Sequence, residues 1–157
     1  MFASLEAWSE SLVTSSGLSA VFFLSAIESI FFPIPTALII TAATGLGADI
    51  ATIVIVATIG SVSGAVIGYR LGKYGGRPFA EKFLKVSHID SVERWFSKYG
   101  VLAVGIAGLT PLPYKVFAIS AGIAKMSLPP FIAVSIVSRF MQFIIFAYFG
   151  AALFRIF

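Results

Sequence analysis

Four long apolar blocks, at about residues 18–47, 50–72, 100–125 and 128–154, dominate this 157-residue chain. A helix needs roughly 20 consecutive apolar residues to cross the hydrocarbon core of a bilayer. Charged residues make up only 11% of the chain, whereas a typical soluble domain is about 25% charged. We therefore expect one all-α integral membrane domain, with several passes through the cell membrane.

Two of the blocks are interrupted by paired prolines. Pro33 and Pro35 divide the block at 18–47, and Pro111 and Pro113 divide the block at 100–125. Proline removes a backbone donor and clashes with the preceding turn, so each pair should end a helix. Such a break is tolerated at membrane depth only where protein or a wet cavity surrounds it. Each interrupted block is therefore predicted to be a re-entrant hairpin, with 50–72 and 128–154 as the membrane-crossing helices.

The two interruptions are related by one constant shift along the chain. The shift that superimposes the first proline pair on the second also places Ala43 on Ala121 and Gly72 on Gly150. Each half then has the same order, a broken hairpin followed by a full span. Many transporters are built from such repeats around a site at the midplane. We expect two pseudo-inverted halves.

Glycine recurs every fourth residue in the span 50–72. This spacing lays a smooth stripe along one helix face and lets another backbone approach closely. The stripe is interpreted as a helix-packing face, and the alternative is a lining for a lipid or substrate path. Its members are Gly60, Gly64, Gly68 and Gly72.

The segment 73–99 between the halves is basic and amphipathic. Six Lys and Arg residues in it outnumber three acids, so the positive-inside rule predicts a cytoplasmic linker. Ser87 and Asp90 fit a capping box for a short helix, and Gly100 fits its end. His88 stands alone at this helix start and is interpreted as an exposed structural residue, with a proton relay as the alternative.

The N-terminal segment 1–17 is expected to form a separate interfacial helix. It carries two acids, no Lys or Arg, and Trp8 at a suitable place for headgroup depth. Without a basic region this segment does not resemble a signal peptide, so we expect it to remain on the mature protein.

Three ionisable residues fall inside the apolar blocks: Glu28, Lys115 and Arg139. A charge at membrane depth costs at least about 2.5 kcal/mol, so each is a candidate for function. Hairpins that meet tip to tip would bring Glu28 close to Lys115, and Gln142 shares a helix face with Arg139. Three interpretations remain open: a structural ion pair of Glu28 with Arg139 or Lys115, a cradle of Lys115 and Arg139 for a lipid phosphate with Glu28 as counter-charge or gate, or Glu28 as the proton carrier of a small-solute transporter.

These residues resemble the DedA family of membrane proteins, which is related to the VTT-domain lipid scramblases. The resemblance rests on Glu28 before Pro33 and Pro35, on "GYRLGKYGG" (68–76), on "WFSKYG" (95–100) and on "TPLPYKVFAISAGIAKM" (110–126). It implies opposed re-entrant hairpins and a role in moving lipids, with polyprenyl phosphate and phospholipid both associated with relatives.

The chain departs from the family pattern at several positions. Many members have an acid where this chain has Thr36, and arginines where it has Gly108 and Tyr114; Lys115 is the nearest basic replacement. We therefore include Thr36, Tyr114 and Gln142 among the candidate substrate-binding or proton-coupling residues.

Several functional classes are disfavoured by the sequence. The absence of cysteine excludes thiol chemistry, and there is no Ser–His–acid set, metal-ligand cluster or phosphate loop. We expect neither an enzyme nor a cofactor, metal or nucleic-acid partner. The predicted function is a flippase or scramblase for an anionic lipid, with a homo-oligomer left open as its assembly state. The alternatives are a proton-coupled small-solute transporter and a non-transporting membrane assembly factor.

Overall fold

The computed structural model describes residues 17–30, 36–110 and 112–156, and every regular element among them is a helix. The expected interfacial helix at the N-terminus and the prolines Pro33, Pro35 and Pro111 lie outside the described residues. The elements are α2 (Gly17–Ile30), α3 (Thr36–Gly45), α4 (Ile50–Phe83), α5 (Val86–Tyr99), α6 (Leu102–Leu109), α7 (Tyr114–Ile123) and α8 (Leu128–Ile156).

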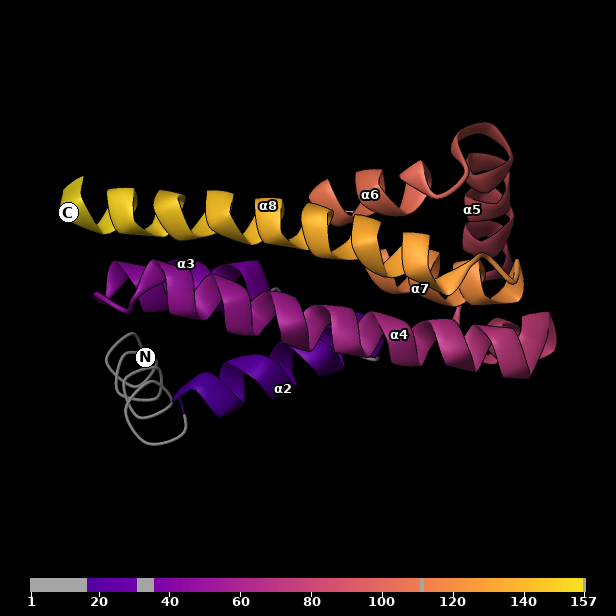
Figure 1. The fold of residues 1–157 in the computed structure, drawn as a ribbon, viewed down its shortest axis with the longest axis horizontal. Helices are drawn as coiled ribbons and strands as arrows, with labels where there is room; N and C mark the ends of the chain where they lie inside the picture. Colours follow the sequence, from indigo (N-terminus) through magenta and orange to yellow (C-terminus); the bar gives the residue numbers. More distant parts are fainter. Residues whose placement is uncertain (1–16, 31–35, 111, 157) are drawn as a thin grey trace.

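Two helices, α4 and α8, are long and apolar enough to cross a membrane. They have 34 and 29 residues, and they run in opposite directions along the length of the molecule (Figure 1). Asp49 begins α4, where its carboxylate accepts hydrogen bonds from the backbone and hydroxyl of Thr52 at 2.8 and 2.6 Å. These two helices form the frame of the fold.

The two proline-containing blocks each form a pair of short helices. Figure 1 shows α2 running inward from the end where α8 finishes, with α3 returning to that end; α6 and α7 do the same from the end occupied by α5. Pro113 immediately precedes α7, with a φ of −70° that suits a helix start. The inner ends of both pairs therefore lie near the middle of the long helices.

Glycines allow these short helices to lie directly against α4. Gly60 and Gly64 face the carbonyl oxygens of Phe22 and Ala26 in α2, so closely that a Cβ atom would overlap them. The residue Gly72 faces α7 in the same way.

Gly68 differs from its neighbours in the stripe. A Cβ atom there would lie 3.5 Å from the Ile119 side chain and 3.6 Å from that of Ala118, both ordinary contacts. The position falls where α4 passes from its contact with α2 to its contact with α7, so the packing is looser.

The long helix α4 extends beyond the predicted end at Gly72. Gly76 has a φ of +66° and a ψ of −172°, a backbone conformation that glycine adopts easily, and it breaks the helix before a last segment that ends at Phe83. Pro78 stands at the start of that segment, where a missing N–H costs nothing. The segment predicted as the beginning of the linker is therefore a redirected continuation of α4.

Arg77 connects this last segment to α5. Its guanidinium lies 2.9 Å from Glu81, 2.5 Å from Asp90 and 3.0 Å from Glu93. The hydrogen bonds to Asp90 and Glu81 raise the pKa of Arg77 above its usual range, so it stays charged. One basic residue thus gathers the three acids of the last α4 segment and α5.

The capping box predicted for α5 is wrong. Lys85 is the N-cap residue and provides no side-chain cap, whereas Ser87 lies inside the helix. Asp90 accepts a hydrogen bond from Arg77 instead of capping the backbone, because the approach of α4 offers a stronger donor. The predicted end of the helix is confirmed at Gly100, which has a φ of +60°.

Candidate functional site

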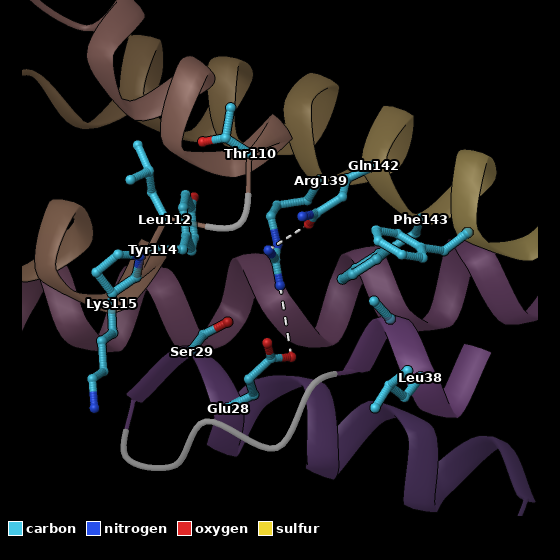
Figure 2. Close-up of a pocket in the computed structure, with 13 residues that line it drawn as sticks. Glu28, Ser29, Leu38, Thr110, Leu112, Tyr114, Lys115, Arg139, Gln142 and Phe143 are labelled. Carbon is cyan, nitrogen blue, oxygen red and sulfur yellow. Dashed lines mark hydrogen bonds and ion pairs between the residues drawn. The ribbon is translucent and has the colours of Figure 1, made fainter. Parts of the chain in front are cut away.

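The inner ends of the short helices and the middle of α8 surround a cavity of about 550 Å³. Figure 2 shows the residues that line it, which come from α2, α3, α7, α8 and the turn after α6. The lining combines charged, hydroxyl and apolar groups. Its polar members are Glu28, Ser29, Thr110, Tyr114, Lys115, Arg139 and Gln142.

Arg139 is the central charged residue of the cavity and is only 4% exposed. Its Nε donates to Ser61 Oγ on α4 at 2.8 Å, and its Nη1 donates to Gln142 Oε1 at 2.7 Å. The rings of Tyr114 and Phe143 lie 4.9 and 4.6 Å from the guanidinium carbon. Two hydrogen bonds and two aromatic rings thus fix the position of the charge.

Arg139 makes two hydrogen bonds to other described residues. A guanidinium has five N–H donors, and the described structure gives hydrogen bonds for two of them. The Nη2 atom lies 3.8 Å from Glu28 Oε2, which makes an ion pair but is too long for a hydrogen bond. Among the described residues, two hydrogen bonds and one ion pair thus hold the guanidinium at the wall of the cavity.

Glu28, in the last turn of α2, joins Arg139 to the start of α3. Its Oε2 accepts a hydrogen bond from the backbone N–H of Thr36 at 3.1 Å and another from the Thr36 hydroxyl. The carboxylate thus lies where the positive end of the α3 dipole is directed. Its side chain is 22% exposed, compared with 5% for that of Arg139.

Tyr114 begins α7 and holds its ring against Arg139. Its hydroxyl donates to Ser135 Oγ on α8 at 2.6 Å, and the whole residue is 6% exposed. The predicted candidate position thus serves as a wall of the site that connects α7 to α8.

Lys115 also lines the cavity, but its side chain takes a different direction. In Figure 2 its ammonium group lies well apart from the pair formed by Glu28 and Arg139. Adjacent residues on a helix point about 100° apart, so Tyr114 and Lys115 cannot both face Arg139. The expected approach of Lys115 to Glu28 is therefore replaced by the approach of Arg139.

The structure brings most of the predicted site residues together, namely Glu28, Thr36, Tyr114, Arg139 and Gln142, with Lys115 at one edge. Sequence reasoning missed Ser61 and Phe143. The separation of Ser61 from Arg139 along the chain equals the shift that relates the proline pairs. Applying that shift to Arg139 would therefore have identified Ser61 from the sequence.

Residues with other predicted roles lie elsewhere. His88 is exposed in the first turn of α5. Within the described parts of the chain, no group of three or more His, Cys, Asp and Glu side chains is arranged to hold a metal ion.

Comparison with known proteins gives a consistent result. Residues 32–152 match the VTT domain. An uncharacterized protein of Haemophilus influenzae is 35% identical over 129 residues, which cover 80% of this chain and 67% of that protein. A protein of Lactococcus lactis named alkaline phosphatase-like is 35% identical over 151 residues, covering 87% and 71%.

Undecaprenyl phosphate transporter A of Bacillus subtilis is 35% identical over 105 residues, which cover 64% of this chain. The matched part is 53% of that transporter, so the chain spans about half of its length. No solved structure matches.

Proposed function

This chain belongs to the VTT-domain family, the DedA family of membrane proteins, and from that premise we propose that it moves an anionic lipid across the membrane. Polyprenyl phosphate and phospholipid are the candidate cargoes, and flipping or scrambling is the mode. The named activity of the Bacillus subtilis relative supports a lipid phosphate. The observation that carries the proposal is the buried Arg139, whose guanidinium is held by its neighbours at the wall of a cavity of about 550 Å³.

The charges around the cavity suit a single anionic group. Arg139 and Lys115 contribute two positive charges and Glu28 one negative charge. A phosphate oxygen that approaches Arg139 meets strong, charge-assisted donors, and the nearby start of α3 adds positive potential. Glu28 then serves as the counter-charge that stabilises Arg139 when no lipid is bound.

We also propose that the two short-helix pairs are re-entrant hairpins in inverted repeats. Contacts that are related by the same shift as the proline pairs support this arrangement. Gly72 of α4 lies against the Ile119 carbonyl of α7, and Gly150 of α8 lies against the Thr41 carbonyl of α3. The shift carries Gly72 onto Gly150 and Thr41 onto Ile119, so exchanging the two halves turns the first contact into the second.

A second pair of contacts follows the same rule. Gly122 lies against the Tyr69 carbonyl, and the Thr44 hydroxyl donates to the Ala147 carbonyl at 3.0 Å. The same shift carries Ser61 onto Arg139, so exchanging the two halves exchanges the two residues of the Arg139–Ser61 hydrogen bond. In the proposed repeat, the bond therefore lies on the axis that relates the halves. The proposed phosphate site therefore lies at the centre of the proposed repeat.

The proposed topology puts the segment 73–99 in the cytoplasm of a plasma-membrane protein and the C-terminal end of α8 outside. Ser97 in α5 and Arg155 in α8 are both exposed, and the sequence has no cysteine. In intact cells, an impermeant maleimide should label Arg155→Cys and not Ser97→Cys. Labelling of Ser97→Cys alone would reverse the topology, and equal labelling of both would refute it.

Lipid movement in liposomes tests the function. The full chain is reconstituted in phosphatidylcholine vesicles with fluorescent phosphatidylglycerol or a fluorescent polyprenyl phosphate, and quenching from outside measures movement. Arg139→Gln should slow movement by roughly 10- to 100-fold, since hydrogen bonds to charged groups contribute about 1.5–3 kcal/mol. Arg155→Gln, at the exposed end of the same helix, is the matched control.

The outcomes distinguish the possible functions. Wild-type rates in Arg139→Gln per folded molecule would contradict a phosphate site at this residue, and failure of the wild type to move either probe would contradict lipid transport. We propose that no bond is cleaved, so free phosphate should not appear in the same vesicles. Phosphate release would instead support the activity suggested by the name of the Lactococcus lactis relative.

A further inference from the structure

Lys115 also lines a second cavity, of about 200 Å³. It is enclosed by the end of α2, the middle and last segments of α4, and one face of α7. Among the described residues that line it, all but Lys115 are apolar. The main wall residues are Ile30, Leu71, Phe79, Phe83 and Ile119.

Among the described residues, Lys115 is the one that lines both cavities. The side chain is half-buried, and its ammonium group extends away from the Glu28–Arg139 pair (Figure 2). Lysine side chains commonly place their methylene groups along apolar surface and their charge at its border. A cation thus marks the boundary between a polar cavity and an apolar one.

The wall of the second cavity depends on the break in α4. Gly76 turns the last segment of α4, and Phe79 and Phe83 of that segment pack with ring centroids 5.0 Å apart. The ion pairs of Arg77 with acids of α5 hold the segment in this position. The wall of the cavity therefore depends on the position of this last segment.

We infer that the second cavity is a subsite for the hydrocarbon chain of an anionic lipid whose phosphate binds at Arg139. The inference rests on the proposed function. A lipid phosphate has its charge next to its hydrocarbon chain, and Lys115 likewise places a charge, of the opposite sign, beside an apolar space. The chain leaves the phosphate toward the α5 end of the molecule.

Size alone does not select this cavity. A larger apolar groove of about 350 Å³ lies between α4 and α8, where Ile55, Ile59 and Phe140 are among its walls. Among the described residues, none that is charged lines that groove, and none lines both the groove and the site of Arg139. It therefore provides a control surface of similar chemistry without the cation.

Photochemical labelling locates the chain. The full protein in phosphatidylcholine vesicles is treated with dodecyl phosphate that carries a diazirine near the phosphate, or with the matching dodecanol. Phosphate-dependent labelling is the labelling that dodecyl phosphate gives and dodecanol does not. We expect it to fall mainly on Leu71 and the peptide 79–84. Phosphate-dependent labelling confined to Leu38 and Phe146, at the mouth of the first cavity, would overturn the subsite and leave the proposed function intact. Labelling that is the same for both probes, and unchanged by Arg139→Gln, would overturn the subsite and the proposed function.

Filling the cavity provides an independent test. Ile30→Trp should reduce lipid movement per folded molecule by about tenfold, because a larger side chain occupies the space of the chain. Ile59→Trp, the same substitution in the control groove, should leave movement unchanged. Leu71→Trp serves if Ile30→Trp does not fold. Normal movement in a folded cavity-filling variant would overturn the subsite, and equal loss in Ile59→Trp would do the same.

Discussion

The two halves of the molecule use the same contacts for packing but different residues at the cavity. Gly72 and Gly150, which are related by the shift that superimposes the proline pairs, each allow a short helix to touch a long helix. At the crossing of α4 and α8, however, the first half has Ser61 where the second has Arg139. Small residues that set helix distances are repeated, whereas the charged residues occur once. The scaffold and the site thus follow different constraints.

Removing the charges that distinguish the halves should have the largest effect. Glu28→Gln leaves Arg139 buried without its carboxylate and should lower the stability by about 3 kcal/mol. The double variant Glu28→Gln with Arg139→Gln should recover part of this loss, because no uncompensated charge remains. Lipid movement should stay lost in the double variant, since the donors for phosphate are absent.

Thermal unfolding in detergent and vesicle transport are measured together on these variants. Recovery of transport along with stability would show that the charges act only as a structural pair. That result would favour the structural interpretation of Glu28 and Arg139 over the phosphate cradle.

Replacing Gly72 and Gly150 by a larger residue tests the packing contacts that the two halves have in common. Gly72→Ala and Gly150→Ala each place a methyl group against a backbone carbonyl and should each cost about 1–3 kcal/mol. Gly68→Ala is the control: its methyl group meets only ordinary contacts, and alanine favours helix by about 1 kcal/mol. Unfolding temperatures that rank Gly68→Ala as the most damaging would contradict the described packing.

The starts of the long helices provide the smallest expected effect. Asp49 precedes α4, and Ser127 holds the equivalent position before α8. Hydrogen bonds from the Thr52 hydroxyl and backbone lower the pKa of Asp49. Because the folded pKa is depressed, this stabilisation is present above the ordinary value of 3.8 and is lost as the pH falls below it.

Asp49→Asn keeps the cap but removes the charge. As the pH becomes acidic, the melting temperature of this variant should therefore fall less than that of the wild type. Acidic pH series of both proteins in detergent measure this. Identical pH profiles would show that the Asp49 cap makes no contribution that depends on its charge.

The sequence predicted those parts of the fold that depend on local chemistry. The long apolar spans, the helix start after Pro113 and the helix end at Gly100 follow from residue properties that act within a few positions. The prediction that Glu28 and Arg139 are candidates also followed from the cost of charge in an apolar segment.

Features that depend on how helices face one another were not predictable in this way. The sequence placed Lys115 near Glu28, but the rotation of α7 directs Tyr114 to the site and Lys115 to its edge. The role of Asp90 was missed because its partner, Arg77, comes from a different segment. Side-chain direction about a helix axis is set by tertiary packing, which spacing along the chain does not specify.

The ion pairs of Arg77 have a consequence for the electrostatic potential of the α5 end. Arg77 offsets one of the three negative charges around it, and the other basic side chains at this end outnumber the two that remain: Arg70, Lys73, Lys82, Lys85, Arg94 and Lys98, all exposed. Beside a leaflet with acidic headgroups, each contributes about 1 kcal/mol of attraction that salt weakens. In the proposed topology, negatively charged lipids would accumulate around this end of the molecule, which would raise their local concentration before any of them enters a cavity.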